Sequence, residues 1–215
     1  MMIKHFLIGA LIAIGAATVT AQTSPAAASA AAIEAPDALV SRLAKEITDA
    51  VKTDKALAAG DAAKVAALID TKIIPFVNFQ RMTASSIGPA WRTATAEQQK
   101  RLQEEFKTLL IRTYAGAVKE IKDQTVAVKP LRLAADDTAV IVRSEVRGKG
   151  EPIQLDYRVG KLTDASGTAW KIYDINILGV WLVETYRGQF AQEINTNGVD
   201  GLIKLLTEKN KSTKK

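Results

Sequence analysis

The sequence predicts an α+β domain in which N-terminal and C-terminal helices pack against a curved, four-stranded antiparallel sheet. Apolar residues recur at helical spacing up to residue 121, and four β-branched or alternating runs follow between residues 124 and 178. Helical spacing returns after Gly179. Helices first, a sheet second and helices last is the order typical of α+β proteins. The length of residues 37–209 suits a single domain with one core.

The N-terminus predicts export. Lys4 provides a positive charge, residues 6–19 form a short apolar stretch, and Val19-Thr20-Ala21 fits the small-x-small pattern of a signal-peptide cleavage site. A membrane anchor would need about 20 predominantly apolar residues. We therefore interpret residues 1–21 as a signal peptide cleaved after Ala21. Residues 22–36, rich in alanine, serine and proline, form a linker before the domain.

Composition excludes several kinds of chemistry. The chain has no cysteine, and its single histidine, His5, leaves with the signal peptide. Zinc sites and Ser-His or Cys-His nucleophile pairs are therefore excluded from the mature protein. We predict no metal, no cofactor and no enzymatic activity.

The charge distribution predicts no nucleic-acid binding. Export removes Lys4 and no acidic residue, so the formal charge falls from +6 to +5. Much of the excess lies in and just before residues 210–215, predicted to be a basic tail, and no basic stripe with interleaved aromatic residues is found. The tail has two interpretations. It is a frayed, solubilising terminus, or it attracts anionic lipid headgroups by about 1 kcal/mol per basic residue.

Capping signals divide the N-terminal half into helices. An apolar residue recurs every four positions from Leu39 to Val51, and Gly60-Asp61 ends that helix and caps the next. Asn78 can cap a short helix that ends near Gly88. Residues 95–98 read as a capping box. The helix that starts there is predicted to continue through Ile121, with a length of about 40 Å.

Four strands and two final helices complete the predicted order of elements. The strands cover residues 124–133, 138–147, 153–162 and 168–178. Their separators have the length of hairpin loops, which predicts an antiparallel meander. The two helices that follow are split at Asn197-Gly198.

Alternation assigns side chains to the two faces of the sheet. One face is apolar and carries Val140, Val142, Leu155, Tyr157, Val159, Tyr173, Ile175 and Ile177. The other face is charged and polar and carries Arg143, Glu145, Arg147, Gln154, Asp156, Arg158, Asp174 and Asn176. We interpret the charged face as solvated surface with cross-strand ion pairs.

Two long blocks resemble one protein family. The first runs from Pro75 to Tyr114 and reads P-F-V-N-F-Q-R-M-T-x-x-x-I-G-x-x-W-R-x-A-T-x-E-Q-Q. The second runs from Trp170 to Phe190 and reads W-K-I-Y-D-I-N-I-L-G-V-W-L-V-E-T-Y-R-G-Q-F. In this order they resemble the signature blocks of the MlaC family, the periplasmic phospholipid shuttles associated with toluene tolerance. The resemblance covers about residues 37–209.

The resemblance implies a fold, a ligand and partners. The family's fold is a cone of helices against a curved sheet, with an apolar pocket that takes phospholipid acyl chains. The implied partners are the MlaA–porin complex at the outer membrane and MlaD of the MlaFEDB transporter at the inner membrane. A periplasmic location, a monomeric state, transient contact with the membrane surface and a role in outer-membrane lipid asymmetry follow from the same resemblance.

The resemblance also implies the residues of the pocket. They are Phe106, Leu110, Tyr114, Val140, Val142, Leu155, Tyr157, Tyr173, Ile175 and Val180. Val180 is expected on the pocket wall, where Val180→Glu would abolish lipid loading. The chain departs from the family pattern at Asn78, Leu178 and Trp181. The last two make the corner after the last strand more apolar, which affects the shape of the pocket mouth.

Two questions stay open at this point. The apolar face of the sheet suits either a solid core or a lipid-filled gap, because both need the same residues. The function likewise has two alternatives to lipid transport: an adaptor that binds only proteins, and an enzyme on a curved-sheet cone. The enzyme requires a carboxylate within reach of its substrate's proton, and the predicted apolar face has none.

We expect the exported protein to start at Gln22. The intact mass of protein isolated from the periplasm should match residues 22–215, as the cleavage pattern predicts. A mass that includes residues 1–21 would contradict both the cleavage site and a freely diffusing carrier.

Overall fold

The computed structural model describes residues 33–117 and 123–212. The predicted signal peptide, most of the linker, residue 121 and the last residues of the tail lie outside these ranges. Within them, no helix combines the length and apolar character needed to cross a membrane.

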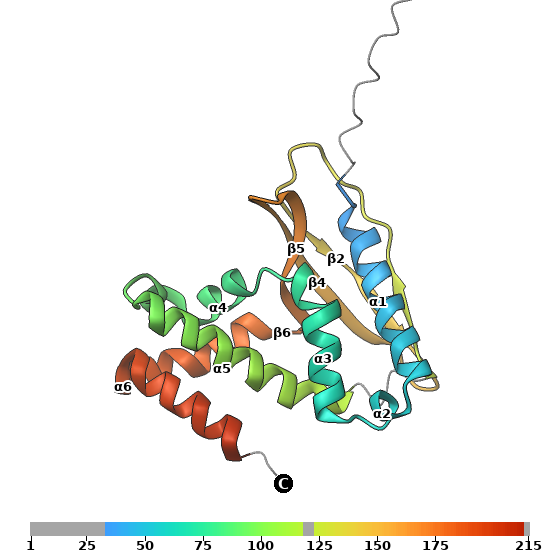
Figure 1. Ribbon diagram of the computed structural model, residues 1–215. Coiled ribbons are helices and arrows are strands. Elements are labelled where there is room, and N and C mark those ends of the chain that lie inside the picture. Colours follow the sequence, from blue (N-terminus) through green and yellow to red (C-terminus); the bar gives the residue numbers. More distant parts are fainter. Residues whose placement is uncertain (1–32, 118–122, 213–215) are drawn as a thin grey trace, which may run out of the picture. The chain divides into compact units, whose positions relative to one another are not determined.

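The α+β class with an antiparallel sheet is confirmed (Figure 1). The helices are α1 (Pro36–Thr53), α2 (Lys55–Ala58), α3 (Ala62–Lys72), η1 (Ile74–Phe76), α4 (Phe79–Ile87), η2 (Gly88–Arg92), α5 (Ala96–Tyr114) and α6 (Leu182–Ser212). The strands are β1 (Thr125–Val128), β2 (Ala139–Val142), β3 (Ser144–Arg147), β4 (Ile153–Asp164), β5 (Gly167–Ile177) and β6 (Val180–Trp181).

The predicted caps start three of these helices. The side chains of Asp61 and Asn78 each accept a hydrogen bond of 2.9 Å from the backbone N–H three residues further on. Thr95 and Gln98 form the predicted capping box at the start of α5, in which each side chain accepts from the backbone N–H of the other. Such bonds satisfy donors that would otherwise lack a partner at the helix N-terminus.

Helix α5 is shorter than predicted. It ends at Tyr114 after 19 residues, which gives about 28 Å at 1.5 Å per residue. Gly116 follows, and glycine is a weak helix former. Ala115 is buried beside Val51 and Val65, so this end of the segment packs against α1 and α3.

The C-terminal helical segment bends where the sequence predicts. Gly198 has a φ of 70°, which favours glycine, and it kinks α6. Residues 210–212, predicted as tail, belong to α6. The amide of Asn210 donates to the Glu105 carbonyl oxygen at 2.9 Å and to its carboxylate at 2.7 Å. These bonds join the end of α6 to α5.

The sheet has six strands rather than four, because the predicted strand 138–147 is broken at Arg143 and the short strand β6 follows β5. Both halves, β2 and β3, pair with β4, and β1 pairs with β3. At the break, the backbone N–H of Ser144 donates to the carboxylate of Asp156 at 3.2 Å, and its hydroxyl donates to the Leu155 carbonyl oxygen. Hydrogen bonds that involve side chains thus replace the backbone hydrogen bonds between the strands at this point.

A bulge in β5 changes the alternation that the sequence predicts. Tyr157 lies opposite Ile175, but Val159 lies opposite Ile172, so Tyr173 is an extra residue on β5. A bulge of this kind leaves one residue unpaired and re-aims its neighbours. Ile172 is therefore buried with the apolar face, and Tyr173 leaves the row that simple alternation assigns to it.

The prediction that the charged face of the sheet is solvated is wrong for three of its residues. Asp156, Asp174 and Asn176 are 5%, 1% and 4% exposed. Asp174 accepts hydrogen bonds from the backbone N–H of Val183 at 3.0 Å and from Arg158 at 2.8 Å. Because Val183 lies in the first turn of α6, this carboxylate fixes the helix to β5.

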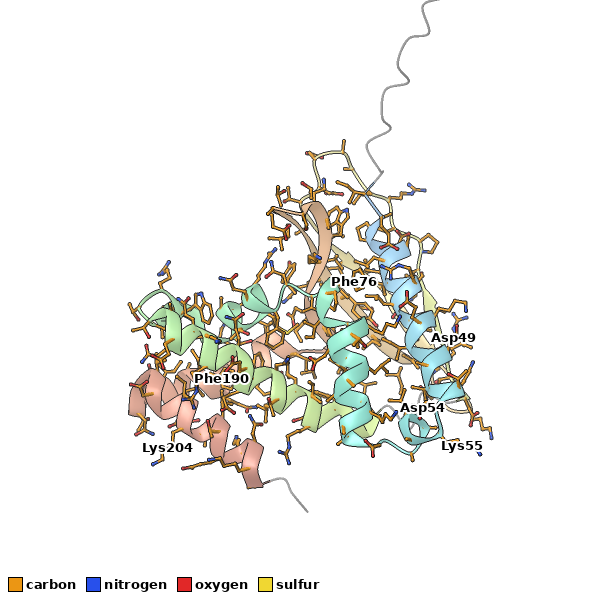
Figure 2. The ribbon with its side chains drawn as sticks, viewed as in Figure 1. Asp49, Asp54, Lys55, Phe76, Phe190 and Lys204 are labelled. Carbon is orange, nitrogen blue, oxygen red and sulfur yellow. The ribbon has the colours of Figure 1, made fainter. Side chains whose placement is uncertain are left out.

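The buried apolar side chains form three separate clusters. The α4–α6 cluster consists of Met82, Ile87, Leu102, Phe106, Leu182, Val183, Tyr186, Phe190, Leu202, Ile203 and Leu206. The α1–sheet cluster consists of Leu39, Val40, Leu43, Val142, Val159, Trp170 and Ile172. The α1–α3 cluster consists of Val51, Leu57, Val65, Leu68 and Ala115. Figure 2 shows Phe190 between α5 and α6, within the first cluster.

Replacing Asp174 with alanine should destabilise the fold by about 2–4 kcal/mol, because buried donors lose their acceptor. Glu184→Ala is the matched control, since Glu184 binds the same arginine from a side chain that is 59% exposed. Glu184→Ala should lower the stability by less than about 1 kcal/mol. Urea unfolding of both variants checks the difference, and equal losses would contradict the anchoring role of Asp174.

Candidate functional site

The larger of two apolar cavities lies among the helices and reaches β5. This helix cavity has a volume of about 270 Å³. Its lining comes from α1, α3, η1, α4, α5, β5 and the start of α6, and comprises Ile47, Val65, Leu68, Ile69, Ile73, Ile74, Val77, Phe79, Met82, Lys107, Leu110, Ile111, Tyr114, Ala117, Ile175 and Leu182.

The second cavity lies between α1 and the sheet. This sheet cavity has a volume of about 200 Å³. Its lining comprises Val40, Leu43, Ala44, Ile47, Ile73, Val77, Leu155, Tyr157, Ile172, Ile175 and Ile177. Ile47, Ile73, Val77 and Ile175 line both cavities, so the two spaces are neighbours separated by these aliphatic side chains.

Backbone pairing positions Val77 at the boundary. Val77 forms a parallel bridge with Ile172 of β5, and the next residue, Asn78, donates its N–H to the Ile172 carbonyl oxygen at 2.8 Å. The link between η1 and α4 is thereby attached to the edge of the sheet. The Val77 side chain is held between the α1–sheet cluster and the α4–α6 cluster and contacts both.

The linings offer little polar chemistry. Among the described lining residues, Lys107 is the one that is charged, and its ammonium group binds Asp70 at 2.9 Å. Hydroxyl groups come from Tyr114 and Tyr157. Burial raises the pKa of the Tyr157 hydroxyl above its usual range, so this phenol stays neutral. An apolar cavity of about 150 Å³ suffices for benzene. These cavities therefore suit apolar ligands. They favour a gap between the sheet and the helices over a solid core.

Half of the pocket residues expected from the sequence lie in these linings. Leu110 and Tyr114 line the helix cavity. Leu155 and Tyr157 line the sheet cavity, and Ile175 lines both. The structure thus places residues from α5, β4 and β5 around the two cavities.

The other expected residues lie elsewhere. Phe106 is 1% exposed and lies behind Phe79, with 5.9 Å between ring centroids. Tyr173 lies against Arg81 because of the bulge in β5. Val180, expected on the pocket wall, is 53% exposed. Val140 and Val142 contribute to the α1–sheet cluster without lining either cavity.

Sequence reasoning missed the walls made by the N-terminal helices. Ile47 of α1 and Ile69 of α3 line the helix cavity. The signal was present, because both residues belong to apolar stripes at helical spacing. Such stripes predict which side of a helix is buried, but they do not distinguish contact with a core from contact with a cavity.

A larger cleft lies on the polar side of the sheet, with a volume of about 670 Å³. Its lining mixes both charges, including Lys129, Arg143, Glu145 and Asp156. These groups partly neutralise each other, as in the ion pair of Lys129 with Glu145 at 2.6 Å. This cleft has no apolar lining comparable to that of the two cavities.

The fold and the cavities define a class: α+β domains with apolar cavities between helices and an antiparallel sheet. Within this class, the chain belongs to the MlaC family, because the family model described as MlaC protein matches residues 41–208. The recognition made from the two sequence blocks is thereby confirmed.

Solved and curated relatives agree with the family. A phospholipid-binding protein from Ralstonia solanacearum, solved in complex with a phospholipid, is 48% identical with a TM-score of 0.77. The match covers 83% of this chain and 98% of that one. Toluene tolerance protein Ttg2D of Pseudomonas putida is 32% identical over 109 residues, which is 51% of this chain and about half (49%) of that protein. The intermembrane phospholipid transport system binding protein MlaC of Haemophilus influenzae is 22% identical over 78% of each chain.

Val77→Phe should cost less than about 1 kcal/mol of stability, because the added ring atoms can enter a cavity. Val142→Phe is the matched control, since Val142 is fully buried in the α1–sheet cluster. Overpacking there should cost about 1–3 kcal/mol. Thermal unfolding of the two delipidated variants measures the difference. Equal destabilisation would indicate a solid core around Val77.

Proposed function

We propose that the protein is a periplasmic phospholipid carrier that holds acyl chains in the helix cavity and the sheet cavity. The observation that carries the proposal is the pair of adjoining apolar cavities, in which no described lining residue is a carboxylate. The relative from Ralstonia solanacearum, solved with a phospholipid, supports the same ligand at 48% identity.

Acyl chains fit the chemistry of the linings. Two chains contain about 30 methylenes, and their exposure to water would cost roughly 25 kcal/mol at about 0.8 kcal/mol each. A carrier can compete with a bilayer only if its cavity is nearly as apolar. On loading, Ile47, Ile73, Val77 and Ile175 move apart, and the two cavities join into one pocket. The headgroup stays outside, because the described residues of the linings offer it few polar groups, namely Lys107 and two phenols.

The biological role that we propose is transport between two membranes. The exported protein takes lipid from, or delivers it to, the MlaA–porin complex at the outer membrane and MlaD of the MlaFEDB transporter at the inner membrane. It acts as a monomer that contacts membranes transiently and thereby maintains outer-membrane lipid asymmetry. The enzyme alternative would need a carboxylate within reach of the substrate, and none of the lining residues that the structure describes is one.

Val77→Glu should lower the phospholipid bound to purified protein at least tenfold. A carboxylate at the boundary of the cavities would draw in water or stay neutral at a cost of several kcal/mol. Val180→Glu is the matched control and should leave loading unchanged, because Val180 is 53% exposed. Solvent extraction and mass spectrometry measure the lipid, and circular dichroism checks the fold.

Two outcomes would contradict the proposal. Wild-type protein free of phospholipid would favour the adaptor that binds only proteins. Loss of lipid in folded Val180→Glu but not in Val77→Glu would indicate that the lipid pocket lies at the corner after β5 instead.

A further inference from the structure

Helix α4 has two different faces. Phe79 and Met82 line the helix cavity. Arg81, Ala84 and Ser85 line a separate cleft. At about 100° per residue, Phe79 and Met82 lie on the side of the helix opposite Ala84 and Arg81. The same helix thus separates an apolar cavity from a polar surface.

The arginine cleft has a volume of about 370 Å³ and is lined by Arg81, Ala84, Ser85, Gly88, Pro89, Trp91, Arg92 and Arg187. The chain reverses at Gly88, whose φ of 73° favours glycine. Helix η2 follows at once and places Trp91 and Arg92 beside α4. Helix α6 supplies Arg187. Among the residues that the structure describes, the lining of the cleft therefore has three cations and no carboxylate.

Two of the arginines are held by contacts that leave their charge uncompensated. The guanidinium carbon of Arg81 lies 3.5 Å from the centre of the Tyr173 ring. Arg187 donates its Nε–H to the Ser85 carbonyl oxygen at 2.8 Å. In the part of the chain that the structure describes, neither side chain forms an ion pair, and the same holds for Arg92.

Arg81 is further confined by the backbone of β4. A side chain at position 160 would come within 2.6 Å of its Nη1 atom, so the guanidinium group occupies space that only glycine leaves open there. Stacking on Tyr173 and this close approach to Gly160 restrict its rotamers. The guanidinium is thus pre-organised before any ligand arrives.

We infer that the arginine cleft binds the phosphate group of an anionic lipid headgroup at a membrane surface. Guanidinium groups match phosphate oxygens with two parallel hydrogen bonds, and three cations around one hollow need an anion to offset their repulsion. Trp91 at the same cleft suits the boundary between headgroups and acyl chains, where tryptophan is enriched. The inference rests on the proposed function, because a lipid carrier must approach membranes. The lipid in question belongs to the membrane and is distinct from the cargo.

Binding to vesicles tests the inference. Wild-type protein, Arg92→Gln and the double variant Arg92→Gln/Arg187→Gln are sedimented with vesicles of phosphatidylcholine alone or with an equal part of phosphatidylglycerol. The double variant should bind the anionic vesicles roughly 25-fold more weakly, about fivefold for each arginine. Arg92→Gln alone should show about a fivefold loss, and the fold should tolerate this change because Arg92 is exposed.

The control removes the same charge elsewhere. Arg132→Gln/Lys149→Gln deletes two exposed cations outside the cleft, and its binding should stay within about twofold of wild type. Equal losses in both double variants would overturn the inference, because general surface charge would then account for binding. Unchanged binding in Arg92→Gln/Arg187→Gln would overturn it as well.

Two further measurements separate other sources of the anion. Inorganic phosphate should release wild-type protein from anionic vesicles more effectively than chloride at the same ionic strength. Wild-type protein that binds inorganic phosphate in calorimetry but no vesicle would overturn the membrane proposal in favour of a free phosphate. If the double variant binds vesicles normally but no longer exchanges lipid with the detergent-solubilised transporter, the cleft is a contact for an acidic protein surface and the membrane proposal is wrong.

Cargo phospholipid is extracted from every variant in parallel. Normal cargo in Arg92→Gln/Arg187→Gln, together with its weaker binding to anionic vesicles, supports the inference. Wild-type protein that binds anionic vesicles through the cleft yet contains no cargo would refute the proposed carrier function while leaving the cleft intact as a lipid-headgroup site.

Discussion

The structure depends on the separation of its apolar side chains into three clusters. Most domain interiors are close-packed, with few voids larger than a water molecule. Here Val77 and Ile175 contact both the α1–sheet cluster and the α4–α6 cluster, yet they leave a cavity on each side. The aliphatic surface that faces these cavities lacks protein partners. It is the part of the interior that an apolar ligand would cover, and covering it would add contacts that the empty protein lacks.

Polar anchors outside the cavities keep the clusters apart. Asp174 fixes the start of α6 to β5, and the Asn78 N–H attaches the start of α4 to the same strand through Ile172. The end of α6 is held to α5 by Asn210 and Glu105. The starts of α4 and α6 are thus positioned by hydrogen bonds to β5 as well as by apolar packing. Such bonds are directional, and buried groups left without partners are costly, so these bonds resist displacement of α4 and α6.

Local pattern predicted the order of helices and strands and their caps, but not the break in 138–147, strand β6 or the long-range relations of the elements. The caps at Asn78 and Thr95 act within four residues and were predictable. The bulge at Tyr173 depends on how β4 and β5 pair, which no periodicity within one strand reveals. Asp174 looked solvated because its partner Val183 belongs to another element. The family resemblance predicted a ligand class. It did not place Val180, whose exposure depends on the short turn between β5 and β6.

Carrier function requires that tails and headgroups be handled by different surfaces. A cation inside the cavity would disfavour acyl chains, because an unpaired charge in an apolar site is costly. The same cation at the surface favours approach to an anionic bilayer. Helix α4 meets both demands, with Phe79 toward the helix cavity and Arg81 toward the arginine cleft. Because both faces belong to one rigid element, a carrier docked through the cleft would hold its cavity at a constant distance from the bilayer, which makes lipid exchange a local event at a fixed geometry.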